Sequence, residues 1–473
     1  MTKHPSLLQA IIPLIALILL LSFNVSFFDD PLGGSNQIAL FIAATICGII
    51  AAFNKVTWHE IQRKILHTIN SAMPAILILL LIGALSGSWM ISGVIPAMIY
   101  YGVDIMHPSY FLVASVILCA IVSLATGSSW STIATVGVAI IGVGNAFGLN
   151  PGLVAGAVIS GAYFGDKMSP LSDTTNLAPA IAGTDLFTHI RYMVYTTLPT
   201  LIVTLIIFGI IGIFHLSGDT TVDTEFIKKG IGETFHISPW LLLVPVILIV
   251  IIIKKIPPLP AMIAGIALGL IFALIFQHDL LNNLIVNGDF HNKYQLLVQA
   301  VASRMTVTTG VGEVDELLST GGMKGMLDTV WLIIAALTFG GVMEASGSLK
   351  RVSEAFMSFI YNDTSLVGTT LLTCIFFNIT ACDQYLSIVV PGKMMQKIYE
   401  QRGLKPEVLS RALEDSATVT SVLIPWNTCG ATQSRVLGVA TLDYLPYCFF
   451  NLISPLMNLF ITLIHYKIRR ITK

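Results

Sequence analysis

Long apolar runs without a charged residue recur along this 473-residue sequence, and they restrict its fold more than any other feature. Examples are residues 7–23, 37–53, 192–214, 238–253 and 445–464, each close to the roughly 20 apolar residues of a membrane-crossing helix. Hydrocarbon contains no water to bond backbone N–H and C=O groups, so these runs must be helical. Charged residues make up only 11% of the chain, against about 25% in soluble domains. The sequence therefore predicts an all-α polytopic membrane protein.

Neither the charge nor the motifs favour a nucleic-acid-binding protein or an enzyme. The net charge is −1, so no basic surface is expected to attract nucleic acid. His59 and Glu60 are followed by Ile, Gln and Arg, so the second histidine of an HExxH metal site is missing. No glycine-rich phosphate loop or nucleophile elbow occurs in the sequence, and we expect no cofactor. All six cysteines lie in or beside apolar segments without a CxxC pair, which is typical of buried thiols: Cys47, Cys119, Cys374, Cys382, Cys429 and Cys448.

The distribution of Lys and Arg predicts the orientation in the membrane. Lys3 precedes the first apolar run and the Asp pair 29–30 follows it, so the N-terminus is expected in the cytoplasm. That run has no small-residue cleavage site after it, and we expect it to remain as the first membrane helix. The Lys pair 254–255 and the basic residues 467–473 are expected on the same side, and the acidic stretch 217–237 outside. Both termini are therefore predicted to be cytoplasmic.

The apolar runs give about ten spans and two paired segments. After the runs at 7–23 and 37–53, the chain is expected to pass through a basic stretch that holds Lys55, Arg63 and Lys64. The further predicted segments are 73–93, 109–147, 152–183, 190–216, 239–253, 258–277, 326–348, 365–398, 407–438 and 444–466.

A repeat at an offset of 255 residues relates two parts of the chain. The matching residues are mostly Gly and Pro, which set backbone shape: Gly137, Gly148, Pro151, Pro170 and Gly183 fall on Gly392, Gly403, Pro406, Pro425 and Gly438. Segment 73–93 starts from the basic side, whereas its counterpart 326–348 ends at Lys350 and Arg351, so the copies are expected to have opposite orientations. Inverted repeats are typical of secondary transporters. The predicted parts are scaffold helices 1–72, repeat 73–216, a scaffold and extracytoplasmic segment 217–325, and repeat 326–473.

Two stretches, 165–180 and 424–435, are too polar for ordinary membrane spans, and they correspond in the repeat. Pro170 and Pro425 interrupt them at matching points and are expected to break a helix inside the membrane. Half-helix ends and hydroxyl or amide oxygens then become available to bind an ion. The candidate ligands here are Ser172, Asp173, Thr174, Asn176, Asn427 and Thr428. The alternative is a polar loop at the cytoplasmic surface.

Two further polar breaks, TGSSWST at 126–132 and TACDQYLS at 380–387, also correspond to each other. Each interrupts a paired segment whose two arms are expected to begin and end on the same side of the membrane. This pattern fits a re-entrant hairpin with a polar tip, which is tolerated only where it lines a cavity. Ser128 at the first tip is matched by Asp383 at the second. The alternative is a pair of complete short helices.

Ionisable residues at membrane depth are costly and are therefore functional candidates. Asp173, Asp383 and Asp415 are the strongest, and Arg435 is expected to pair with one of them. Weaker candidates are Glu344 and Asp166; Asp166 and Lys167 could form an interfacial ion pair, and Glu414 is expected to point away from Asp415. A carboxylate in a poorly hydrated site favours its protonated form, whereas a nearby Na⁺ favours the charged form. Asp173 and Asp383 are thus predicted to bind Na⁺ or H⁺ in competition.

In three segments the chain resembles the NhaC-type Na⁺/H⁺ antiporter family of the ion transporter superfamily. They are GAYFGDKMSPLSDTTNLAPAIAGTDL (161–186), TACDQYLS (380–387) and LEDSATVTSVLIPWNTCGATQ (413–433). The resemblance spans nearly all of the chain. It implies a multi-pass protein of the bacterial cytoplasmic membrane that exchanges Na⁺ and H⁺. It also implies a homodimer in membrane lipid and an elevator-like movement of a transport domain against a scaffold.

Some relatives within this family exchange Na⁺ and H⁺ against small carboxylates such as malate and lactate, and others carry amino acids. An organic-anion exchanger is therefore the nearest alternative. In that alternative, Arg435 and the half-helix N-termini would hold the carboxylate of the solute while the Asp residues bind Na⁺.

Overall fold

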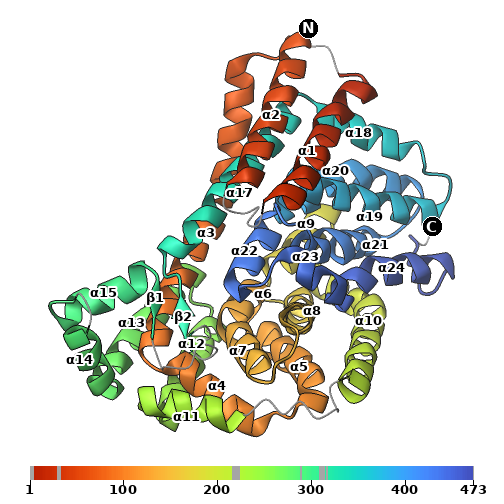
Figure 1. Cartoon of the computed structure of the whole chain (residues 1–473). Coiled ribbons are helices and arrows are strands. Elements are labelled where there is room, and N and C mark those ends of the chain that lie inside the picture. The colour runs from red at the N-terminus through yellow and green to blue at the C-terminus, as the bar shows by residue number, and fades with distance from the viewer. Residues whose placement is uncertain are drawn as a thin grey trace.

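The computed structural model describes residues 5–28, 34–215, 224–287, 290–307, 315 and 318–471, and these are almost entirely helical (Figure 1). Within them, eight helices are long and apolar enough to cross a membrane, or ten if two bent helix pairs each count as one span. The only strands described are β1 (Met305–Thr306) and β2 (Ser319–Thr320), which pair antiparallel. The prediction of an all-α polytopic membrane protein is confirmed.

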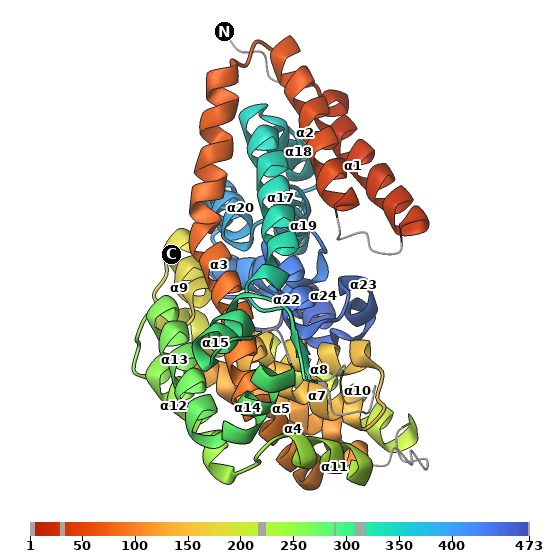
Figure 2. The same ribbon diagram turned by 60° about the vertical axis from the view of Figure 1, so that its left-hand side comes forward.

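The first three helices are α1 (Leu7–Phe27), α2 (Ser35–Phe53) and α3 (Trp58–Ile91). The expected start of the third helix at residue 73 is wrong, because α3 begins 15 residues earlier, after the N-cap Thr57. Arg63 and Lys64 lie on its first turns, where their long side chains can reach water, and Lys55 lies in the turn before it. Pro74 lies inside the helix without ending it. Figure 2 shows α3 running from the end of the molecule near α2 to the end near α4.

The first repeat forms a chain of short and broken helices. Its elements are α4 (Val94–Ile105), α5 (Pro108–Thr126), α6 (Ser129–Thr132), a π-helical turn (Ile133–Gly137), α7 (Val138–Ala146), α8 (Pro151–Met168), α9 (Asp173–Ala182) and α10 (Leu186–His215). Between the repeats lie α11 (Thr224–Thr234), α12 (Leu243–Ile253), α13 (Pro258–Phe276), α14 (His278–Asn287) and α15 (Lys293–Ala302).

The second repeat follows the same order. Its elements are α17 (Leu327–Ala345), α18 (Ser348–Met357), α19 (Asp363–Thr380), α20 (Gln384–Gln401), α21 (Pro406–Leu413), a π-helical turn (Glu414–Thr418), a short 3₁₀ turn (Ser421–Leu423), α22 (Thr428–Leu437), α23 (Thr441–Tyr444), a 3₁₀ turn (Leu445–Tyr447) and α24 (Phe449–Leu463).

The element boundaries bear out the repeat. Five helices of the first repeat, α5, α6, α8, α9 and α10, each begin 255 residues before their counterparts α19, α20, α21, α22 and α23. Gly148 and Gly403 share a left-handed backbone (φ 66° and 68°), as do Gly183 and Gly438 (φ 89° and 69°). Glycine adopts this conformation at the lowest steric cost, and its presence at matching positions gives the same turns in both copies. The domain boundaries drawn from the sequence stay a prediction.

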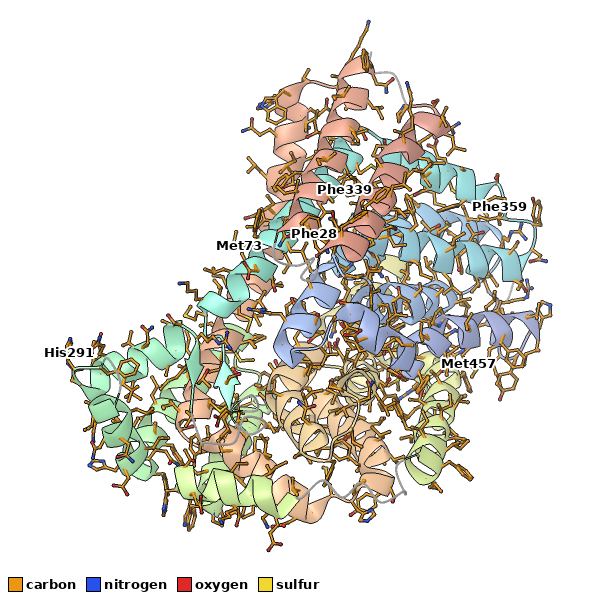
Figure 3. The ribbon with its side chains drawn as sticks, viewed as in Figure 1. Phe28, Met73, His291, Phe339, Phe359 and Met457 are labelled. Atoms are coloured by element: carbon orange, nitrogen blue, oxygen red, sulfur yellow. The ribbon has the colours of Figure 1, made fainter. Side chains whose placement is uncertain are left out.

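Large apolar side chains cover the outside of the helices. Phe28, Met73 and Phe359 are each at least 40% exposed and project outward, whereas Phe339 lies fully buried on α17 (Figure 3). Such a surface suits lipid rather than water. All six cysteines are buried free thiols, as expected.

The hairpin arm α5 packs directly against α8. A methyl group built on Gly161 would collide with the carbonyl oxygen of Val116, and one built on Gly165 would collide with that of Ala120. These are backbone atoms, so no side-chain rotation could relieve the overlap. The two helices are therefore in backbone contact, as is common where helices pack in a membrane.

We expect Gly161→Ala to destabilise the protein by about 1–3 kcal/mol, the usual cost of overpacking a tight core. Gly48→Ala in α2 is the matched control, because its new methyl group would meet only the Cγ1 of Val342, at 4.0 Å. Thermal unfolding in detergent should show a melting temperature lower by several degrees for the first variant and unchanged for the control. Equal melting temperatures would contradict the backbone contact between α5 and α8.

Candidate functional site

A cavity of about 710 Å³ lies where the breaks of the two repeats meet. Gly127 and Ser128 contribute the tip between α5 and α6, and Asp383 contributes the tip between α19 and α20. Asp173 lines it at the start of α9, and Thr428 at the start of α22. The rest of the wall comes mainly from α3 between residues 71 and 78 and from the turn between α12 and α13.

Four helices begin at this cavity, and each has a polar side chain at its N-cap. Ser128 accepts a hydrogen bond from the backbone N–H of Ser131 (3.2 Å) and caps α6, and Asp383 accepts one from Leu386 (2.9 Å) and caps α20. Ser172 caps α9 and Asn427 caps α22 in the same way. Ser, Asp and Asn are preferred caps, so the local sequence explains why the helices restart here. Their N-termini place partial positive charge around the cavity.

Three carboxylates and one amine line the cavity. Asp166 is buried and accepts two hydrogen bonds from Ser129, from its N–H at 3.1 Å and its hydroxyl at 2.6 Å. Asp173 accepts one from the hydroxyl of Tyr385 at 3.2 Å. Asp383 is the third acid, and Lys255 at the turn between α12 and α13 is the only basic residue among the lining residues that the structure describes. The lining therefore has a net negative formal charge, which favours a cation.

The two hairpin tips are attached to the helix breaks by these bonds. Ser129 joins the first tip to Asp166 on α8, and Tyr385 joins the second tip to Asp173 on α9. The backbone N–H of Thr428 donates to the carbonyl of Cys382 at 3.0 Å, which joins the second tip to α22. Because the backbone of the tips is paired with protein groups, the interruption of the helices is possible at membrane depth.

Seven sequence candidates line the cavity: Ser128, Asp166, Ser172, Asp173, Thr174, Asp383 and Thr428. Asn176 and Asn427 are not part of the lining. Asn176 donates to the carbonyl of Ser172 at 2.7 Å and Asn427 to that of Asn378 at 3.0 Å, so both amides hold the breaks in shape.

Asp415 lies outside the cavity lining, in a fully buried ion pair with Lys167. It also accepts a hydrogen bond from Asn458 on α24 at 2.7 Å. The interpretation of Asp166 and Lys167 as an interfacial pair is wrong, since Lys167 is buried and points to Asp415 while Asp166 points to Ser129. Consecutive residues on an α-helix project about 100° apart, so neighbours in sequence face different partners.

The expected pairing of Arg435 with one of the acids is also not found. Arg435 is exposed on α22 beside Gly321 and Gly325, and no carboxylate among the described residues lies within ion-pair distance of it. Glu344 on α17 instead pairs with Lys64 on α3 at 2.6 Å. Neither Arg435 nor Glu344 lines the cavity.

The described part of the chain contains no group of three or more His, Cys, Asp or Glu side chains that could hold a metal ion. A cation in the cavity would therefore be held by one or two carboxylates together with hydroxyl, amide and backbone oxygens. Such oxygen donors suit a hard ion such as Na⁺. Asp173 and Asp383, the two predicted Na⁺ ligands, lie on the same cavity but belong to different repeats.

A polytopic helical protein whose two repeats break their helices at one shared polar cavity is a secondary transporter. The sequence profile described as the Na⁺/H⁺ antiporter family matches residues 161–466. The chain belongs to this family, which confirms the resemblance to NhaC-type antiporters.

Several curated relatives align over nearly the whole chain. The malate-2H⁺/Na⁺-lactate antiporter of Bacillus subtilis (strain 168) is 37% identical over 454 residues, which cover 96% of this chain and 93% of the relative. The Na⁺/H⁺ antiporter NhaC of Alkalihalophilus pseudofirmus is 35% identical and covers 89% of each chain. The arginine/ornithine antiporter ArcD of Halobacterium salinarum is 33% identical over 96% of this chain and 91% of its own. Similarity alone therefore does not distinguish a cation exchanger from an exchanger of organic solutes.

We expect Lys167→Met to destabilise the protein by about 3–5 kcal/mol, because it leaves the buried Asp415 carboxylate without its partner. The double variant Lys167→Met, Asp415→Asn removes both charges and should regain most of the loss. Thermal unfolding in detergent measures both effects. If the double variant were as unstable as the single one, the buried pair would not be the source of the loss.

Proposed function

We propose that this chain exchanges Na⁺ for H⁺ across the cytoplasmic membrane by alternating access, with Asp173 and Asp383 binding either cation. One observation carries the proposal: carboxylates from both repeats meet at a single cavity formed by two hairpin tips and two helix breaks. Movement of one repeat against the other would then open the same site to either side.

Electrostatics explains why the two cations compete. Asp383 is buried, and its carboxylate is stable there when it carries a proton or when a bound cation compensates its charge, whereas Asp173 is an exposed residue of the cavity lining. Na⁺ also gains the nearby hydroxyl oxygens of Ser172 and Thr174, which lie on the lining of the cavity. Exchange then requires only that the site does not cross the membrane empty.

Asp173→Asn and Asp383→Asn should each reduce Na⁺-dependent proton flux in everted vesicles to background, a loss of at least about 100-fold, since the neutral amide neither binds H⁺ nor compensates Na⁺. Asp443→Asn, at an exposed position on α23 away from the cavity, is the control and should transport normally. Normal rates and normal Na⁺ half-saturation in both cavity variants would overturn the proposal.

A second candidate function is exchange of Na⁺ and H⁺ against a small organic solute. The cavity volume favours it, because about 710 Å³ is far more than one Na⁺ needs. Arg435 lies outside the lining, which argues against the version of this function in which Arg435 binds the carboxylate of the solute. If proton flux in the vesicles required malate, lactate, arginine or ornithine in addition to Na⁺, this second function would replace the first.

We further propose that the structure is open to the cytoplasm. The cavity is lined by Lys255 and by residues 71–78 in the middle of α3, and the Lys/Arg distribution assigns Lys255 and the start of α3 to the cytoplasmic side.

Ser71→Cys tests this orientation, because Ser71 is an exposed residue of the cavity lining and all native cysteines are buried. A membrane-impermeant maleimide should label it in inside-out vesicles but not in intact cells, and saturating Na⁺ should slow the reaction. Gln299→Cys, on the exposed face of α15, should react with the opposite preference. Labelling of Ser71→Cys from the outside alone would reverse the assignment.

A further inference from the structure

Glu414 is a buried acid that neither the cavity nor an ion pair accounts for. Its side chain is fully buried, and neither Oε1 nor Oε2 has a hydrogen-bond partner in the described part of the protein. An ionised carboxylate without donors in such a place is strongly disfavoured. Its neighbour Asp415 shows the contrast, since that carboxylate accepts bonds from Lys167 and Asn458. The surroundings of Glu414 therefore suit the neutral acid.

The groups around Glu414 place it next to the transport cavity. Thr174 of α9 and Thr418 of its own turn lie beside the carboxyl, and Thr174 is also part of the cavity lining. The Thr174 hydroxyl lies 3.2 Å from that of Ser172, a second lining residue. Glu414 is thus one side chain behind the wall. A proton can pass such a hydroxyl pair to reach the enclosed carboxyl.

The charged groups that act on Glu414 are Lys167 and Asp166, both on α8. The ammonium group of Lys167 pairs with Asp415, and Asp166 accepts its two hydrogen bonds from Ser129. Lys167 is close enough to stabilise the anion when Glu414 releases its proton, but it does not form an ion pair with Glu414 in this conformation.

The local backbone also sets Glu414 apart. It is the first residue of the π-helical turn Glu414–Thr418, which interrupts the helix of the second repeat. The corresponding residues of the first repeat belong to α8, which stays regular, and the residue that matches Glu414 is Ile159. A π-turn inside a helix is costly and is frequent at functional sites. Only the second repeat therefore has an acid at this position.

We propose that Glu414 is a second proton-binding site, which takes up and releases one proton in each transport cycle in addition to the exchange at Asp173 and Asp383. This inference rests on the proposed Na⁺/H⁺ exchange. One-for-one replacement at the cavity moves no net charge, so a proton carried on Glu414 makes the cycle electrogenic. The proton leaves as the carboxylate forms on the side where the cavity opens, and it is regained on the other side.

Proteoliposomes with fixed Na⁺ and pH gradients test this assignment through the membrane voltage at which net flux stops. Glu414→Gln should still exchange Na⁺ for H⁺, but with one proton fewer per Na⁺, so that transport loses its dependence on voltage. Glu344→Gln is the matched control, because its carboxylate is paired with Lys64 away from the cavity. This control should keep the wild-type ratio.

An unchanged ratio in Glu414→Gln, or voltage-independent transport by the wild type, would overturn the inference while leaving Na⁺/H⁺ exchange in place. Absence of any Na⁺/H⁺ flux in the wild type would instead reject the proposed function. Binding of ²²Na⁺ to the purified variant shows whether it is folded. If Glu414→Gln does not fold, Glu414→Asp replaces it: it should keep the voltage dependence with a displaced pH profile, and a pH profile identical to that of the wild type would overturn the assignment.

Discussion

The need to pair every backbone polar group at membrane depth governs the centre of this protein. Two helices stop and restart there, and two hairpins turn there, yet each restarted helix has a capping side chain. Within the second repeat, Trp426 donates to the carbonyl of Ile379 at 2.8 Å and Thr428 to that of Cys382. Between the repeats, the hydroxyl of Tyr385 donates to Asp173 at 3.2 Å. The broken backbone is tolerated because its polar groups are paired with protein groups, and the cavity lies where the breaks of the two repeats meet.

The repeat is regular in its backbone but not in its charges. Each acid of the cavity corresponds to a hydroxyl in the other copy: Asp383 to Ser128, Asp173 to Thr428 and Asp166 to Ser421. Both residue types act as caps or oxygen ligands, so one backbone geometry accepts either. A symmetric backbone can therefore have a carboxylate at a given position of one repeat and a neutral hydroxyl at the same position of the other. Fewer uncompensated carboxylates means a lower cost of burial.

Much of this arrangement could be predicted from the sequence, because its cause is local. Pro, Gly and the capping residues act over four or five residues, and for this reason the breaks at Pro170 and Pro425 and the tips at Ser128 and Asp383 were expected where they occur. The start of α3 was missed because a basic stretch resembles a loop, although Lys and Arg side chains on a helix end reach water.

Partners across the fold could not be predicted. The pairing of Lys167 with Asp415 and the isolation of Glu414 depend on how α8 faces the π-turn of the second repeat, and no periodicity in either segment encodes it. The only available signal was rotation along the helix, which already separates Asp166 from Lys167. The exposed position of Arg435 likewise follows from the packing of α22.

The glycine contact between α5 and α8 has a mechanical consequence. Because Gly161 and Gly165 have no side chain, α8 lies in direct backbone contact with α5, the first arm of the first hairpin. If the cavity opens in turn to the two sides, as proposed, we expect α5 and α8 to move together and the relative motion to occur where helices are packed less closely.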